Sequence, residues 1–145
     1  MACLDWLPNV EAFQALTETE LAVIDGFCRE KEFSHDDRIF KEGDDATHLY
    51  VVTEGMVDLR FDLPARETSE AQTLSSVQEN RIFGWSSMVP PFRYKLSAYC
   101  ASERCRVMMI ERSRFQDYLR QYPQMGYRVL TELLKVVGKR FQQLQ

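Results

Sequence analysis

Between residues 33 and 110 the sequence consists of short β-prone runs separated by turn-forming residues. The runs cover residues 31–33, 38–40, 49–52, 56–61, 73–78, 96–101 and 105–110. The stretches between them are rich in Gly, Asp and Ser, which favour turns because they adopt positive φ or bond their own backbone. About eight strands with no helix between them predict a jelly roll or closed antiparallel roll rather than an α/β fold.

A helix is predicted before this β region. Residues 17–20 read Thr-Glu-Thr-Glu, a capping box in which Thr17 and Glu20 each bond the backbone N–H of the other. Apolar residues at helical spacing follow and give the helix one apolar face: Leu21, Ile24, Phe27 and Cys28. A shorter helical segment is expected earlier, around Trp6, Leu7 and Phe13.

Two helical patterns follow the β region. The first begins after Ser113 and should end at Tyr122, because a proline follows. The second carries an apolar seam at steps of three and four residues: Tyr127, Leu130, Leu134, Val137, Phe141 and Leu144. Such a seam is typical of helix pairing, so we expect an isologous dimer through this helix. The alternative is that the helix packs back on its own β-roll.

The chain of 145 residues, 45% of them hydrophobic, has the size and composition of one domain with a sizeable core. We expect helices in residues 1–30, a β-roll in 31–112 and helices in 113–145, with no helix-turn-helix domain. A net charge of −4 excludes a wholly basic nucleic-acid binder. No apolar run reaches the length of a membrane span and no signal peptide is recognisable, so the protein is expected in the cytoplasm, away from membranes.

The sequence contains no recognisable catalytic or metal-binding constellation, so no enzyme activity and no metal are predicted. Cys100 and Cys105 have no second pair or histidine nearby, and we expect both to be reduced thiols in the core. The two histidines, His35 and His48, occupy a turn and a strand start, where solvated side chains are expected.

The segment from Arg81 to Pro91 is the candidate binding site. A β-branched residue and an aromatic precede Gly84, two serines and a Pro-Pro stop, which predicts a strand leading into one short helical turn. Successive backbone N–H groups at such a turn form an anion-binding concavity, and a glycine permits close approach of a ligand. The hydroxyls of Ser86 and Ser87 would add donors. The alternative is an ordinary turn with solvated serines.

Several motifs together resemble the cyclic nucleotide-binding domain of catabolite activator-type regulators over nearly the whole chain. Residues 39–44 read Ile-Phe-Lys-Glu-Gly-Asp, and residues 49–57 read Leu-Tyr-Val-Val-Thr-Glu-Gly-Met-Val. Phe-Gly at 83–84 and Ser-Ala at 97–98 follow in the family's order. The resemblance implies a mainly β fold with flanking helices, namely an eight-stranded jelly-roll β-roll. It also implies a cassette whose short helix cradles a cyclic phosphate.

In that family the cassette reads Phe-Gly-Glu, an aliphatic residue, Ala or Ser, a short loop, and then Arg, Ser or Thr, and Ala. Here Ser87 occupies the Ala/Ser position, while Trp85 replaces the glutamate that bonds the ribose and Leu96 replaces the arginine that neutralises the phosphate. Losing both bonds weakens cyclic nucleotide binding by about two to four powers of ten unless other groups replace them. Arg93 and Lys95 are candidate replacements, although strand alternation turns Lys95 away from the face of Leu96.

The resemblance therefore implies a regulatory sensor that binds a small anionic ligand in the β-roll and signals through the C-terminal helix. The ligand is cyclic AMP, cyclic GMP, another small anion, or a flatter molecule stacked on Trp85. The expected ligand-binding residues are Phe83, Gly84, Trp85, Ser86, Ser87, Met88, Arg93, Lys95, Leu96, Ser97 and Ala98. A separate regulatory protein is a further expected partner, and direct DNA binding is not expected. A ligand-free dimerising scaffold and a haem or redox sensor of the same fold stay open as alternatives.

Overall fold

The computed structural model describes residues 7–61 and 73–143. Its strands are β1 (Cys28–Ser34), β2 (Arg38–Phe40), β3 (His48–Glu54), β4 (Val57–Arg60), β5 (Thr73–Val77), β6 (Ile82–Phe83), β7 (Ser97–Cys100) and β8 (Arg104–Glu111). Its helices are the 3₁₀ turns η2 (Leu7–Asn9) and η4 (Trp85–Met88) and the α-helices α1 (Glu18–Asp25), α2 (Arg112–Gln121) and α3 (Pro123–Gln143). Residues 62–72, between the predicted β-prone runs 56–61 and 73–78, lie outside the described residues.

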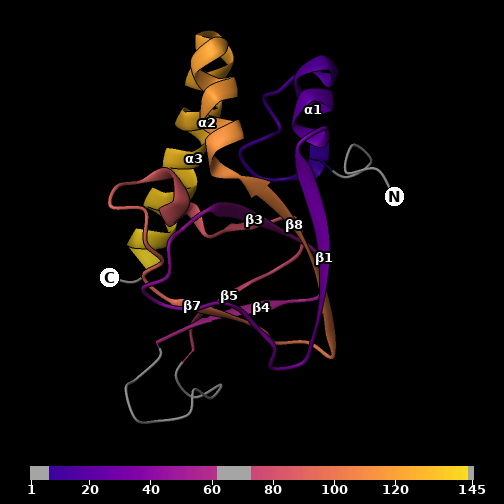
Figure 1. Cartoon of the computed structure of the whole chain (residues 1–145), viewed down its shortest axis with the longest axis vertical. Helices are drawn as coiled ribbons and strands as arrows, with labels where there is room; N and C mark the ends of the chain where they lie inside the picture. The colour runs from indigo at the N-terminus through magenta and orange to yellow at the C-terminus, as the bar shows by residue number, and fades with distance from the viewer. Residues whose placement is uncertain (1–6, 62–72, 144–145) are drawn as a thin grey trace.

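The strands form two antiparallel four-stranded sheets, ordered β1-β8-β3-β6 and β2-β7-β4-β5. Figure 1 shows the sheets one above the other, with the three α-helices gathered on one side of the roll. The helices pack on the outer face of the sheet that contains β3 and β8. The predicted jelly-roll β-roll with flanking helices is therefore confirmed.

Strand β3 is buried on both faces, which explains its continuous apolar run. Leu49 and Val51 point to the outer face and join the core beneath the helices. Tyr50 and Val52 point into the space between the sheets and join the core of the roll. The molecule thus has two apolar cores, separated by one sheet whose residues alternate between them.

The N-terminal helix begins where the capping box predicts. The N–H of Thr17 donates to Glu20 Oε1 at 2.9 Å, and the N–H of Glu20 donates to Thr17 Oγ1 at 3.2 Å. The predicted extension of this helix to Phe27 and Cys28 is wrong, because the helix ends at Asp25 with Gly26 as its cap. Cys28 instead begins β1 and pairs with Ile110 of β8, so the β-roll starts three residues before the predicted boundary at 31.

Helix α3 has two apolar faces, one buried against its own domain and one exposed, and the dimer through the predicted seam stays a prediction. Met125, Val129 and Leu133 are buried against the rest of the domain. Tyr127, Leu130 and Leu134 face away, with 74%, 49% and 73% of their surfaces exposed. Val137 is half-buried. Leu144 and the side chain of Phe141 lie outside the described part of the chain.

Cys100 and Cys105 are fully buried in the core of the roll, as predicted, and both are free thiols. Burial and the adjacent Cys100 thiol raise the pKa of the Cys105 thiol, so it stays protonated. The sequence-based division of residues 1–145 as a single domain stays a prediction.

Among the helices in the described ranges, none has both the length and the apolar character that crossing a membrane requires.

Candidate functional site

The segment after β6 forms the predicted strand exit and helical turn. Gly84 has a φ of +75°, a left-handed conformation that favours glycine, and the 3₁₀ turn η4 starts at the next residue. The N–H of Ser87 donates to the Gly84 carbonyl at 3.1 Å. A Cβ on Gly84 would lie 3.0 Å from Cδ2 of Tyr50 and 3.3 Å from the carbonyl oxygen of His48. Both the backbone angle and the close packing therefore require glycine here.

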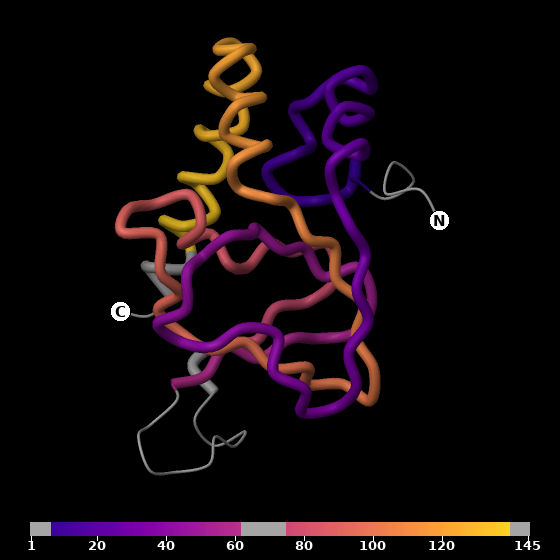
Figure 2. The backbone as a smooth tube through the Cα atoms, in the orientation of Figure 1, coloured from indigo at the N-terminus to yellow at the C-terminus, as the bar shows by residue number. Residues whose placement is uncertain are grey.

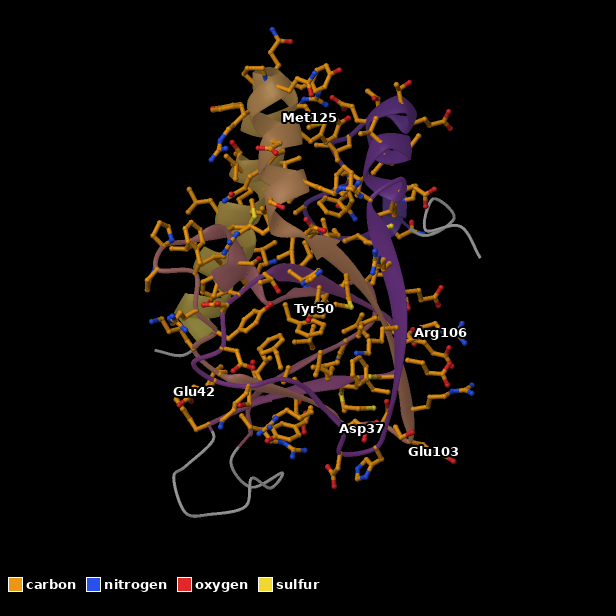
Figure 3. All side chains as sticks on the ribbon, in the orientation of Figure 1. Asp37, Glu42, Tyr50, Glu103, Arg106 and Met125 are labelled. Carbon is orange, nitrogen blue, oxygen red and sulfur yellow. The ribbon has the colours of Figure 1, made fainter. Side chains whose placement is uncertain are left out.

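Four aromatic side chains fill the roll beside Gly84: Phe40, Tyr50, Phe83 and Tyr94. The rings of Phe40 and Tyr94 stack with centroids 3.7 Å apart, and those of Tyr50 and Phe83 stack at 5.0 Å. Figure 3 shows Tyr50 pointing into the space between the sheets. The Tyr94 hydroxyl donates to the His48 carbonyl at 2.8 Å, and burial raises the pKa of Tyr94 and of Tyr50. The hydroxyls therefore stay protonated, and the cluster is uncharged.

Trp85 and Met88 lie on the opposite side of the cassette from these rings. Both are half-buried and pack against the core beneath the helices. Turn η4 lies against α2, and Figure 2 shows the connection from residue 82 onward running close to the C-terminal helices. Trp85, which stands where the family has its ribose-binding glutamate, thus packs against the core between the sheet and the helices.

The two serines of the turn differ in their surroundings. Ser86 is half-buried, whereas Ser87 is fully buried and its Oγ has no hydrogen-bond partner among the described residues. Leaving a buried hydroxyl unpaired typically costs about 1–3 kcal/mol. The Ser87 hydroxyl is therefore an uncompensated polar group within the turn.

The closing pair of the cassette lies at the start of β7. Ser97 is fully buried, and its Oγ accepts the N–H of Glu42 at 2.8 Å. Ala98 is fully buried in the core of the roll, opposite Phe40 of β2. Leu96, which stands where the family has its phosphate-binding arginine, is half-buried.

The two candidate replacements for that arginine point elsewhere in this structure. Arg93 is 56% exposed; its Nη1 donates to the Gly43 carbonyl at 3.0 Å and lies 3.2 Å from Oδ1 of Asp45. Lys95 is exposed, as strand alternation predicts. In this structure Arg93 is thus bonded to the turn at residues 43–45, and Lys95 is exposed to solvent.

Sequence reasoning did not predict that Tyr94 belongs to the aromatic cluster in the roll. Its burial follows the same alternation that buries Ala98. Sequence reasoning also missed Arg112, the first residue of α2, because the sequence around it does not distinguish it from the other arginines.

The prediction for His35 fits the structure, since its side chain is 48% exposed and Nδ1 lies 3.6 Å from Asp36. The prediction for His48 needs correction. It is half-buried at the start of β3, Nδ1 lies 2.8 Å from Thr47 Oγ1, and burial lowers its pKa despite Glu111 nearby.

In the part of the chain that the structure describes, no group of three or more His, Cys, Asp or Glu side chains is arranged to hold a metal ion.

Comparison with known proteins identifies similar domains. A family model described as the cyclic nucleotide-binding domain matches residues 30–122. A proposed cyclic nucleotide-binding protein from Geobacter metallireducens is 28% identical with a TM-score of 0.82, over 97% of this chain and 99% of that one. A cyclic nucleotide-binding domain from Methylobacillus flagellatus is 21% identical with a TM-score of 0.78, over 97% and 77%.

The catabolite activator protein of Thermus thermophilus is 20% identical with a TM-score of 0.71, over 92% of this chain and 61% of that one. Among proteins with curated functions, none matches the sequence significantly.

Proposed function

The chain belongs to the cyclic nucleotide-binding domain family, and from this premise we propose that it is a cytoplasmic, non-catalytic regulatory domain that binds a small effector at the cassette. The observation that carries the proposal is the Phe83-Gly84 turn leading into η4, with Ser87 buried and its hydroxyl unpaired. A buried hydroxyl without a partner is rare in folded proteins, because its desolvation is not compensated. An effector that bonds Ser87 would remove this cost.

Cyclic AMP and cyclic GMP are the first effectors to consider, and another small anion is the next. The family binds cyclic nucleotides, and Ser87, Ser97 and Ala98 match its cassette. Without a guanidinium at position 96, the cyclic phosphate loses a charge-assisted bond of about 1.5–3 kcal/mol. We therefore propose weak binding of cyclic nucleotides and tighter binding of an effector that uses backbone N–H groups and serine hydroxyls.

Signalling is proposed to pass through α3 to a second copy of the chain. Tyr127, Leu130 and Leu134 form an exposed apolar face, and the same face of a second α3 would bury it. An effector that changes the packing of η4 against α2 then changes the orientation of α3 within the dimer. A separate regulatory protein reads that change in this proposal, and direct DNA contact is not part of it.

A ligand-free dimerising scaffold is the second candidate. The observation that favours it is the cluster of four stacked rings beside Gly84, which fills the roll with the protein's own side chains. Trp85 and Leu96, which replace the family's two polar ligands, favour it as well.

Thermal unfolding of the whole chain distinguishes the two. Millimolar cyclic AMP, cyclic GMP, AMP or inorganic phosphate is added, with haem as a test of the redox alternative. A ligand at 100 times its Kd adds about 2.7 kcal/mol to the free energy of unfolding, which raises Tm by several degrees. The sensor proposal expects such a shift with one of the anions and its loss in Ser87→Ala, with Ser34→Ala, at an exposed serine of β1, as the matched control. The absence of any shift supports the scaffold.

A further inference from the structure

Three segments of the chain meet at Arg112, the first residue of α2. Its Nη1 donates to the carbonyl of Ala46 at 3.0 Å. Its backbone N–H donates to the carbonyl of Thr47 at 2.9 Å. The start of α2 is therefore held, by side chain and backbone together, to the turn that precedes β3.

The same side chain covers the loop between η4 and β7. The Arg112 Cζ lies 4.6 Å from the centroid of the Phe92 ring, a cation–π contact. Phe92 has a φ of +59°, a strained conformation for a bulky residue that persists only where its surroundings fix it. The N–H of Ala46 donates to the Phe92 carbonyl at 2.8 Å. Arg112, Ala46 and Phe92 thus contact one another in a closed triangle.

The rest of this loop is bonded to the same turn. The N–H of Tyr94 donates to the carbonyl of Asp44 at 3.1 Å, and the N–H of Gly43 donates to the carbonyl of Tyr94 at 2.8 Å. Asp45 and Arg93 form a β-bridge between these hydrogen bonds. The loop and the turn are therefore hydrogen-bonded into one unit, and Arg112 joins that unit to α2.

We propose that Arg112 is a positioning residue that couples the cassette loop to α2, and through α2 to α3. This coupling rests on the proposed function, in which a bound effector displaces the cassette loop. Arginine suits this place because a guanidinium can donate to the Ala46 carbonyl and at the same time lie over the Phe92 ring. A lysine ammonium does not combine these two contacts in a fixed geometry.

Amide hydrogen exchange on the ligand-free chain tests the coupling. Exchange is followed in residues 84–95 and 112–121 for Arg112→Met, Phe92→Leu and the double variant. Each single variant should speed exchange about tenfold in both segments, the change expected when a contact of about 1.4 kcal/mol is lost. The double variant should exchange about as fast as Arg112→Met, because Arg112→Met already removes the contact with the ring that Phe92→Leu removes.

Three further variants sharpen the result. Phe92→Tyr keeps the ring and should exchange like the wild type, Arg112→Lys should resemble Arg112→Met, and Arg114→Met should leave both segments unchanged. The proposal is overturned if each variant changes only its own segment, or if the effects of the two single variants add. Since the measurement uses no ligand, such a failure leaves the effector-induced shift in Tm untouched, and the two proposals fail separately.

Discussion

The phenol ring of Tyr94 lies flat on the ring of Phe40, with centroids 3.7 Å and planes 11° apart. The Tyr94 hydroxyl donates to the backbone carbonyl of His48 at 2.8 Å. It also accepts a hydrogen bond from the backbone N–H of His48 at 3.3 Å. The segment before β7 is thus fixed to both β2 and β3 through one side chain. The far end of the cassette depends on this contact for its position.

Tyr94→Ala should lower the free energy of unfolding by about 3–5 kcal/mol, because it leaves a cavity in a close-packed aromatic cluster. Tyr94→Phe keeps the stack and removes only the hydroxyl bonds, so a loss of about 1–2 kcal/mol is expected. Urea denaturation measures both values, and Tyr127→Phe on the exposed face of α3 is the control. If both Tyr94 variants lost the same free energy of unfolding, the stacked rings would contribute nothing to stability.

Gly84→Ala should destabilise the fold more than Gly43→Ala. Both glycines have positive φ, +75° and +91°, so alanine is strained at each. A Cβ at Gly43 meets nothing within 4 Å, whereas at Gly84 it meets Tyr50 at 3.0 Å. The difference in unfolding free energy between the variants should be about 1–3 kcal/mol, the usual cost of overpacking. A larger loss from Gly43→Ala would show that the ring of Tyr50 yields easily.

Leu134→Glu should convert a dimer to a monomer without changing the fold. The residue is 73% exposed in the single chain, so the substitution costs little there but places a charge in the proposed helix pair. Sedimentation velocity gives the mass of each species. Val23→Glu, at an apolar side chain of α1 that is 42% exposed, should leave the mass unchanged. A monomeric wild-type chain at micromolar concentration argues against pairing through α3.

The protein should lose stability in acid partly through Glu20. Burial alone would raise the pKa of this carboxyl, but the N–H of Thr17 and the guanidinium of Arg128, 2.6 Å away, hold it below its ordinary value of 4.5. A lowered pKa stabilises the fold above pH 4.5, and that contribution is lost as the pH falls further.

Glu20→Gln retains a capping-box residue and removes the charge. Its stability, measured by urea denaturation at pH 7 and at pH 3.5, should depend less on pH than that of the wild type. Glu18→Gln, on the exposed side of the same turn, serves as the control. An unchanged pH dependence in Glu20→Gln would assign the acid sensitivity to other carboxyl groups.

Much of the fold could be predicted because strong local signals agree with the tertiary structure. The capping box at Thr17 places the first helix, and the Phe83-Gly84 sequence places the strand exit and the turn after it. Gly26 lies within the helix that the apolar spacing predicts, yet in the structure it ends the helix, and Cys28 begins β1. A glycine near a helix end allows the helix either to continue or to stop. Here the pairing of Cys28 with β8 favours the stop.

The site was predictable in outline but not in its contacts. Matching the cassette assigned Trp85 and Leu96 to the two ligand positions, but it did not predict that Trp85 packs against the core beneath the helices. That direction depends on helices far along the chain. The contacts of Arg112 with Ala46 and Phe92 are equally non-local, because they join residues that the β-roll brings together.

The central claim is that this cassette is an effector site whose affinity for cyclic nucleotides is limited by Leu96. Isothermal titration of cyclic AMP into the wild type and Leu96→Arg tests it, with Lys95→Arg as a control on the exposed neighbouring position. We predict weak binding by the wild type and Lys95→Arg, and binding about 10- to 100-fold tighter by Leu96→Arg, the gain from one charge-assisted bond. Micromolar binding by the wild type with no gain in Leu96→Arg, or no binding by any of the three, would contradict the claim.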